Sequence, residues 1–185
     1  NVGSKVIMAM TLITTNTPSG ASSSSFTSSI DSTYKLYIFK WLDVGPATDD
    51  VNFTFNGSDD TSSHSYDITK TTTYFHGYHS EDDGTAALSY SSGNDIAQGT
   101  GYQYLTSGLG GGADESCAGT LWLFNPSNTT YVKHFYARCN QYWESNYSSD
   151  GFIGGYFNTT AAITAIDFKM TSGNFDGIIK MYGVG

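Results

Sequence analysis

The stretch ITAIDFKMTSGNFDGIIKMYG, residues 163–183, decides the fold of this chain. Within it, apolar and polar residues alternate from Ile166 to Met170, which is the two-residue period of a half-buried β-strand. A cluster of turn-forming residues follows at 173–177, and a second strand pattern covers 178–182. This order predicts a β-hairpin. Because a hairpin alone is barely stable in water, we expect it to dock into a larger sheet.

Similar short runs recur along the whole sequence. Further strand candidates, with turn residues between them, cover 26–30, 34–42, 51–55, 66–78, 88–92, 102–107, 118–124, 131–140 and 152–157. A first strand has four apolar residues on one face, namely Val6, Met8, Met10 and Leu12. About ten to twelve short strands with this spacing are typical of an antiparallel β-sandwich, and we expect a jelly-roll-like one. We expect a single domain over 1–185, in which 1–25 forms an N-terminal strand and arm.

Three segments carry more detailed predictions. Residues 34–42 have apolar side chains on both faces, which predicts a strand in the middle of a sheet. Residues 51–55 alternate strictly, which predicts a strand with one polar face in solvent. Residues 94–99 are expected to hold one helical turn.

The charge balance excludes two classes of partner. The 185 residues contain 8 Lys and Arg against 17 Asp and Glu, a net charge of −9. Nucleic acids and anionic membranes both favour basic surfaces, so we expect neither as a partner. No run reaches the roughly 18 apolar residues of a membrane span. The 14 Tyr, 11 Phe and 3 Trp instead predict aromatic surface in the core and at subunit interfaces.

A second hairpin is predicted around the loop NPSNTT, residues 125–130. With the loop centred near Asn128, Trp122 faces His134 and Cys117 faces Cys139. Directly opposed positions have Cβ atoms about 4.5–5.5 Å apart, just beyond the usual disulfide range. Two alternatives remain open for the cysteines, namely a cross-strand disulfide and two free buried thiols.

The densest ionisable cluster is HGYHSEDD, which contains His76 and His79. Residues three apart on a strand point to opposite faces, so the two imidazoles do not converge on a metal ion and we expect no metal site. Trp143, with Tyr142 beside it near a strand end, is the tryptophan best placed to meet a ligand or partner. These four residues are therefore the candidate contacts.

Signatures of enzymes and cofactor sites are weak. The run GLGGGA at 108–113 formally matches the dinucleotide-binding pattern. Acidic residues and a strand follow it, however, instead of the helix whose N-terminus holds a pyrophosphate. The sequence contains no GxSxG nucleophile motif. We therefore expect no cofactor and no catalytic residues.

Four segments resemble a group of virion structural proteins of marine tailed bacteriophages. They are SSIDSTYKLYIFKW (28–41), FNPSNTTYVKHFYA (124–137), GGYFNTT (154–160) and IDFKMTSGNFDGIIKMYG (166–183). The resemblance implies a structural protein of the virion surface, a capsid decoration protein or tail component. We expect it to be non-enzymatic, to bind other virion proteins and, because stable interfaces are rich in aromatic residues, to form a homo-oligomer such as a trimer. The alternatives are the head of a tail fibre, which binds a host surface glycan, and the subunit of a self-assembling surface filament.

Overall fold

A computed structural model describes residues 9–185, and within them the chain consists entirely of strands and loops. Its twelve strands are β1 (Met10–Asn16), β2 (Ser24–Phe26), β3 (Leu36–Pro46), β4 (Phe53–Ser58), β5 (Lys70–Ser80), β6 (Ala86–Tyr90), β7 (Gln103–Tyr104), β8 (Cys117–Phe124), β9 (Lys133–Trp143), β10 (Tyr147–Phe157), β11 (Ala165–Met170) and β12 (Phe175–Val184). The predicted all-β class and strand number are confirmed, but no helix forms at 94–99. Val6 and Met8 of the predicted first strand lie outside the described residues.

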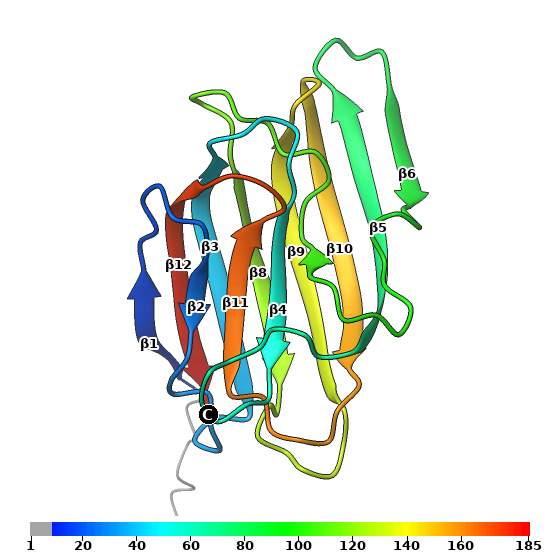
Figure 1. The fold of residues 1–185 in the computed structure, drawn as a ribbon. Coiled ribbons are helices and arrows are strands. Elements are labelled where there is room, and N and C mark those ends of the chain that lie inside the picture. The colour runs from blue at the N-terminus through cyan, green and yellow to red at the C-terminus, as the bar shows by residue number, and fades with distance from the viewer. Residues whose placement is uncertain (1–8) are drawn as a thin grey trace, which may run out of the picture.

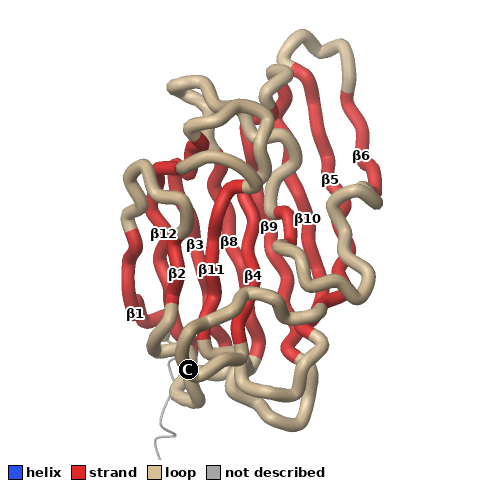
Figure 2. Tube along the Cα trace, in the orientation of Figure 1, coloured by secondary structure: helices blue, strands red, loops and turns tan. Residues whose placement is uncertain are grey.

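Two antiparallel sheets pack face to face as a β-sandwich, seen in Figure 1 and Figure 2. The large sheet has eight strands in the order β1-β12-β3-β8-β9-β10-β5-β6, and the small sheet has four in the order β2-β11-β4-β7. β3 has a neighbour on each side, which confirms the central strand predicted at 34–42. In Figure 1 the large sheet extends beyond the small one at β5 and β6. The sandwich is confirmed, while the jelly-roll connectivity stays a prediction.

The predicted hairpin in 163–183 is wrong. β11 pairs with β2 and β4 in the small sheet, whereas β12 pairs with β1 and β3 in the large sheet. The connection between them therefore crosses from one layer to the other. Gly173 and Gly177 adopt φ values of 74° and 146° at this crossing, which glycine tolerates because it has no Cβ. The alternating pattern is the same for a hairpin within one sheet and for two strands in facing sheets. In both cases each strand turns its apolar face toward the core between the sheets.

Aromatic rings fill that space. The ring of Phe168 in β11 stacks on Phe53 of β4, with 5.7 Å between centroids. Across the core it lies 5.7 Å from Phe39 and 6.2 Å from Trp41, both in β3. Phe26 of β2 packs against it edge-on at 6.1 Å. All five side chains are buried, so Phe168 joins the rings of both sheets.

The polar face of β4 is buried, contrary to the prediction for 51–55. Thr54 and Asn56 are 1% and 0% exposed. The Thr54 hydroxyl donates a hydrogen bond to the carbonyl of Lys169 at 2.8 Å, and the Asn56 amide donates to the carbonyl of Thr100 at 3.0 Å. The polar groups of this strand therefore find protein partners instead of water.

β8 and β9 form the predicted second hairpin, but the register differs by two residues. Trp122 lies opposite Tyr136 and not opposite His134. The reason is that the loop is centred on Thr129, one residue later than the predicted centre at Asn128. A shift of two residues keeps every side chain on its predicted face and changes only its neighbours.

No other layer covers the outer face of the large sheet within residues 9–185. Cross-strand neighbours form a continuous apolar row on this face: Leu12, Tyr182, Ile38, Trp122 and Tyr136. The rings of Trp122 and Tyr136 lie 4.7 Å apart between centroids. Contiguous apolar surface of this kind marks interaction sites on soluble proteins.

Replacing Phe168 by Ala should lower the free energy of unfolding by about 3–5 kcal/mol, because it removes a fully buried ring and leaves a cavity. Urea denaturation followed by tryptophan fluorescence measures the loss. Phe75→Ala is the matched control, since that ring is 41% exposed on the outer face and its stacking on Phe152 is worth about 1 kcal/mol. Equal losses in the two variants would contradict the central place given to Phe168.

Candidate functional site

The four candidate contact residues lie at one end of the large sheet. The cross-strand register aligns Tyr142 with Ser148 and His79 in one row. Because successive residues of a strand face opposite sides, Tyr142 and His79 project to the outer face, and Trp143 and His76 project to the inner face. The structure thus gathers the four residues at one end but divides them between two surfaces.

The inner group is an aromatic cluster around Trp143. The indole ring lies 5.2 Å from Tyr147, 5.7 Å from Tyr78 and 6.1 Å from His76, centroid to centroid. The glycine run packs on the same ring, since a Cβ at Gly108 would lie only 2.6 Å from Trp143 Nε1. Burial lowers the pKa of His76. Trp143 and His76 therefore already have partners inside the protein.

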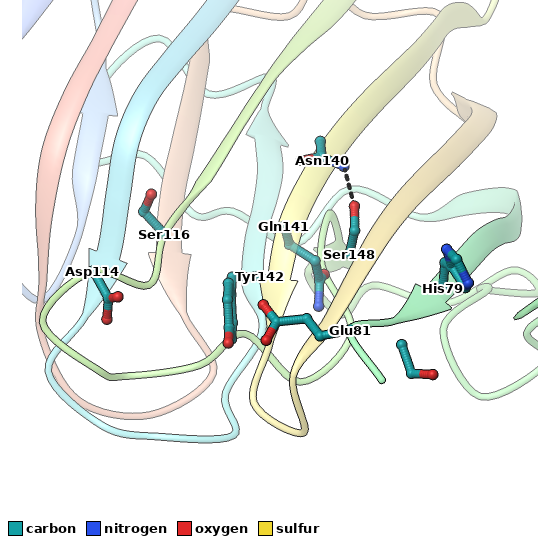
Figure 3. Close-up of a pocket in the computed structure, with 9 residues that line it drawn as sticks. His79, Glu81, Asp114, Ser116, Asn140, Gln141, Tyr142 and Ser148 are labelled. Carbon is teal, nitrogen blue, oxygen red and sulfur yellow. Dashed lines mark hydrogen bonds between the residues drawn. The ribbon is translucent and has the colours of Figure 1, made fainter. Parts of the chain in front are cut away.

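The outer group lines an open hollow, shown in Figure 3, with a volume of about 480 Å³. Its lining is polar and consists of His79, Ser80, Glu81, Asp114, Ser116, Asn140, Gln141, Tyr142 and Ser148. In Figure 3 the Glu81 carboxylate points toward Tyr142. Burial, followed by this carboxylate, raises the pKa of the Tyr142 phenol, which donates a hydrogen bond to Asn146 at 2.9 Å. The hollow is acidic and disfavours anions.

The outer hollow holds no preformed nucleophile. Ser148 accepts a hydrogen bond from the Asn140 amide at 3.4 Å, and within residues 9–185 no hydrogen bond joins Ser148 to His79. The His79 ring instead lies 2.9 Å from Asp83, and these side chains are 57% and 91% exposed. Among the described residues, no group of three or more His, Cys, Asp or Glu is placed to hold a metal ion. Ser148 and His79 therefore do not form a nucleophile–base pair in this structure.

A second hollow, which we call the loop hollow, lies at the other end of β9, beside the β8–β9 loop. Its volume is about 510 Å³, and it is lined by Phe124, Asn125, Asn128, Thr130, Tyr131, Val132, His134 and Thr160. The sequence predicted only a turn here. The signal that could have revealed the site is the pair of aromatic residues, Phe124 and Tyr131, on either side of a loop rich in amide and hydroxyl groups.

Cys117 and Cys139 are free and buried in this structure, which corresponds to the free-thiol alternative. The actual register pairs Cys117 with Gln141 and Cys139 with Gly119. The thiols are therefore diagonal neighbours on one face and not directly opposed. Burial, followed by the neighbouring Cys139 thiol, raises the pKa of the Cys117 thiol, so Cys117 stays protonated at neutral pH.

Comparisons of this chain with protein-family models, with curated proteins and with solved structures find no match. Within residues 9–185 no helix is present that is long and apolar enough to cross a membrane. A function must therefore be inferred from the sequence and from the surfaces of the molecule.

Both thiols should be unreactive in the native protein and accessible after unfolding. With Ellman's reagent the native chain should react slowly, because Cys117 and Cys139 are only 2% and 1% exposed. In guanidinium, without a reductant, it should release two equivalents, and Cys139→Ala should release one. Absence of reaction from the unfolded, unreduced wild type would mean that the cysteines are bridged.

The stability of the protein should depend on the ionisation of His76. Burial lowers the pKa of this residue below its ordinary value of 6.5, so the unfolded state binds more protons than the native state in this range. The stabilisation from this site is complete above pH 6.5 and is lost as the pH falls through the lowered pKa. Between pH 7.5 and 5.5, the Tm of wild type should fall more than that of His76→Phe.

Differential scanning calorimetry measures both curves. His134→Phe is the matched control, because the His134 side chain is exposed and forms no ion pair within residues 9–185, and its curve should be parallel to that of wild type. Parallel curves for wild type and His76→Phe would contradict the assigned role of His76.

Proposed function

We propose that this chain is a non-enzymatic structural protein that assembles with copies of itself on the surface of a bacteriophage particle. The observation that carries the assembly is the free edge of the large sheet at β1. Within residues 9–185 this strand pairs with β12 on one side only, and its Met10 and Leu12 are 49% and 51% exposed. In the proposed assembly, β1 continues the sheet into a second copy.

β1 lacks two of the devices that usually protect an edge strand. Its sequence, MTLITTN, contains no charged residue and no proline, and both of these prevent edge-to-edge pairing. A β-bulge between Leu12 and Thr14 interrupts its ladder with β12. The free side of the strand still offers main-chain donors and acceptors to another strand.

Side chains next to β1 enlarge the contact surface. On the outer face Leu12 lies opposite Tyr182, and Met10 lies opposite Val184. Leu36 of β3 follows next to Val184. Strand pairing would supply hydrogen bonds, and burial of these side chains would supply the hydrophobic contribution. An apolar centre combined with main-chain hydrogen bonds is typical of stable interfaces.

The partner edge determines the form of the assembly. Pairing of β1 with β1 of a second copy is isologous and closes as a dimer. Pairing of β1 with β6, the other edge of the large sheet, is heterologous and gives a ring such as a trimer or an open filament. β6 also exposes apolar side chains, with Leu88 at 74% and Tyr90 at 56%. Both modes require β1.

The resemblance to virion proteins of marine tailed bacteriophages supports the proposed location. Its segment 166–183 covers most of β11 and β12, which belong to different sheets, so the resemblance includes central strands of the fold. A non-enzymatic role is supported by the outer hollow, where Ser148 and His79 form no nucleophile–base pair within residues 9–185. Other virion proteins would be further partners of such a protein.

A charge placed in the middle of β1 should prevent assembly. Leu12→Lys puts an ammonium group on a half-exposed position, which a single copy tolerates. At the proposed contact it replaces the apolar side chain of Leu12 with a charge, and lysine on an edge strand is one of the devices that prevent edge-to-edge pairing. We expect wild type to sediment as an oligomer at micromolar concentration and Leu12→Lys to sediment as a monomer. Sedimentation velocity measures both, and circular dichroism checks that the variant is folded.

Leu88→Lys on β6 is the matched control and also separates the two modes of pairing. If it keeps the wild-type mass, the copies pair through β1 alone; if it becomes a monomer as well, β1 pairs with β6. A monomeric wild type, or an oligomer that survives Leu12→Lys, would contradict the proposal.

A further inference from the structure

The loop hollow is a surface that assembly through β1 does not use. We propose that it binds an uncharged pyranose sugar. In this arrangement the rings of Phe124 and Tyr131 contact the C–H face of the sugar, and the amides and hydroxyls of the loop bind its hydroxyl groups. This activity goes beyond the proposed structural function.

The chemistry of the lining favours such a ligand. The hollow combines two aromatic rings with two carboxamides and two hydroxyl side chains, and no Asp, Glu, Lys or Arg lines it. This neutrality stands out in a chain with a net charge of −9. A pyranose presents an apolar C–H face to an aromatic ring and a rim of hydroxyls to neutral polar groups. No Asp, Glu, Lys or Arg side chain in the lining is placed to pair with an ionic ligand.

Buried contacts hold the walls of the hollow in place. The Lys133 ammonium is buried behind it and donates hydrogen bonds to the carbonyls of Tyr131 at 2.8 Å and Thr159 at 3.2 Å. These carbonyls belong to the two segments that line the hollow on either side. The Asn128 carboxamide oxygen accepts the backbone N–H groups of Thr130 and Tyr131, both at 2.8 Å. The site is thus formed before any ligand binds, which lowers the entropic cost of binding.

Asn125 provides an independent observation. Its side-chain oxygen is buried and has no hydrogen-bond donor in the part of the chain that the structure describes. Its backbone adopts a φ of 46°, a left-handed conformation that is uncommon outside glycine. A buried acceptor without a donor is costly, and strained backbone concentrates at ligand sites. The fold thus leaves the hydrogen-bonding capacity of this oxygen unused, and a rotation of the carboxamide, whose residue is only partly buried, would present the oxygen to a ligand hydroxyl.

The dimensions favour a chain of sugar units. A volume of about 510 Å³ lies within the range of small-molecule sites. Beyond the hollow, the row of rings continues along the outer face. Phe124 lies 5.3 Å from Tyr136, and Tyr136 lies 4.7 Å from Trp122, centroid to centroid. An oligosaccharide anchored in the loop hollow could therefore extend along β8 and β9 over these rings.

Calorimetric titration of the full chain with linear neutral oligosaccharides of glucose, mannose, galactose and N-acetylglucosamine tests the proposal. We expect at least one of them to bind. Tyr131→Ala should weaken that binding at least about fivefold, because a stacked ring is worth about 1 kcal/mol. Tyr131→Phe, which keeps the ring, should bind within about twofold of wild type. Tyr131 is 70% exposed, so its truncation should leave the fold intact, as a thermal melt would verify.

Two further variants make the result specific. Tyr142→Ala at the outer hollow is the matched control and should bind like wild type. Leu12→Lys should also bind like wild type, so failure of the assembly proposal would leave this test intact. Absence of binding to every sugar at millimolar concentration would overturn the inference. Binding that is lost in Tyr142→Ala but kept in Tyr131→Ala would overturn it too, as would binding of a proline-rich peptide but of no sugar.

Discussion

The contact of Phe168 with rings from both sheets is the constraint on which the rest of this structure depends. The ring stacks on Phe53 within its own sheet and meets Phe39 and Trp41 across the core. A sandwich is held together by such interdigitation of its two inner faces. Because β11 and β12 lie in different sheets, the segment that carries Phe168 also ties the two layers together covalently.

That arrangement determines which surfaces remain for function. A four-stranded sheet covers one face of an eight-stranded sheet, so the outer face of the large sheet keeps its apolar row. Within residues 9–185 the large sheet is open, so it also keeps two edges, β1 and β6. Open edges and uncovered aromatic faces make a monomer prone to aggregation, and the same features provide contact surfaces in an assembly. The proposed self-association and the proposed sugar site use different parts of this surface.

The sequence predicts the local pattern well and the pairing of strands poorly. Alternation from Ile166 to Met170 correctly identifies the buried face of β11, because a two-residue period depends only on local geometry. β11 pairs with β2 and β4, which are distant in the sequence, and not with β12. The residues of the segment 163–183 do not reveal this choice of partner. The buried polar face of β4 has the same origin, since Asn56 finds its partner at Thr100, far along the chain.

The sequence predicts the position of single residues of the candidate sites, but not which residues come together in space. The sequence selects Trp143 because it lies near a strand end, and the structure places it there, among Tyr78 and Tyr147. The loop hollow depends on the three-dimensional placement of Tyr131 beside Phe124. Loop length fixes that placement, and a shift of two residues in register leaves the apolar pattern unchanged.

Amide hydrogen exchange, measured by mass spectrometry on the wild-type chain at two protein concentrations, tests the central claim most directly. If β1 continues the sheet into a second copy, the amides of residues 10–16 exchange more slowly at tens of micromolar than at submicromolar concentration, since pairing engages their free side. The core amides of β3 and β8 should exchange at the same rate at both concentrations. Exchange of residues 10–16 that does not depend on concentration, in samples that sediment as oligomers, would contradict the account.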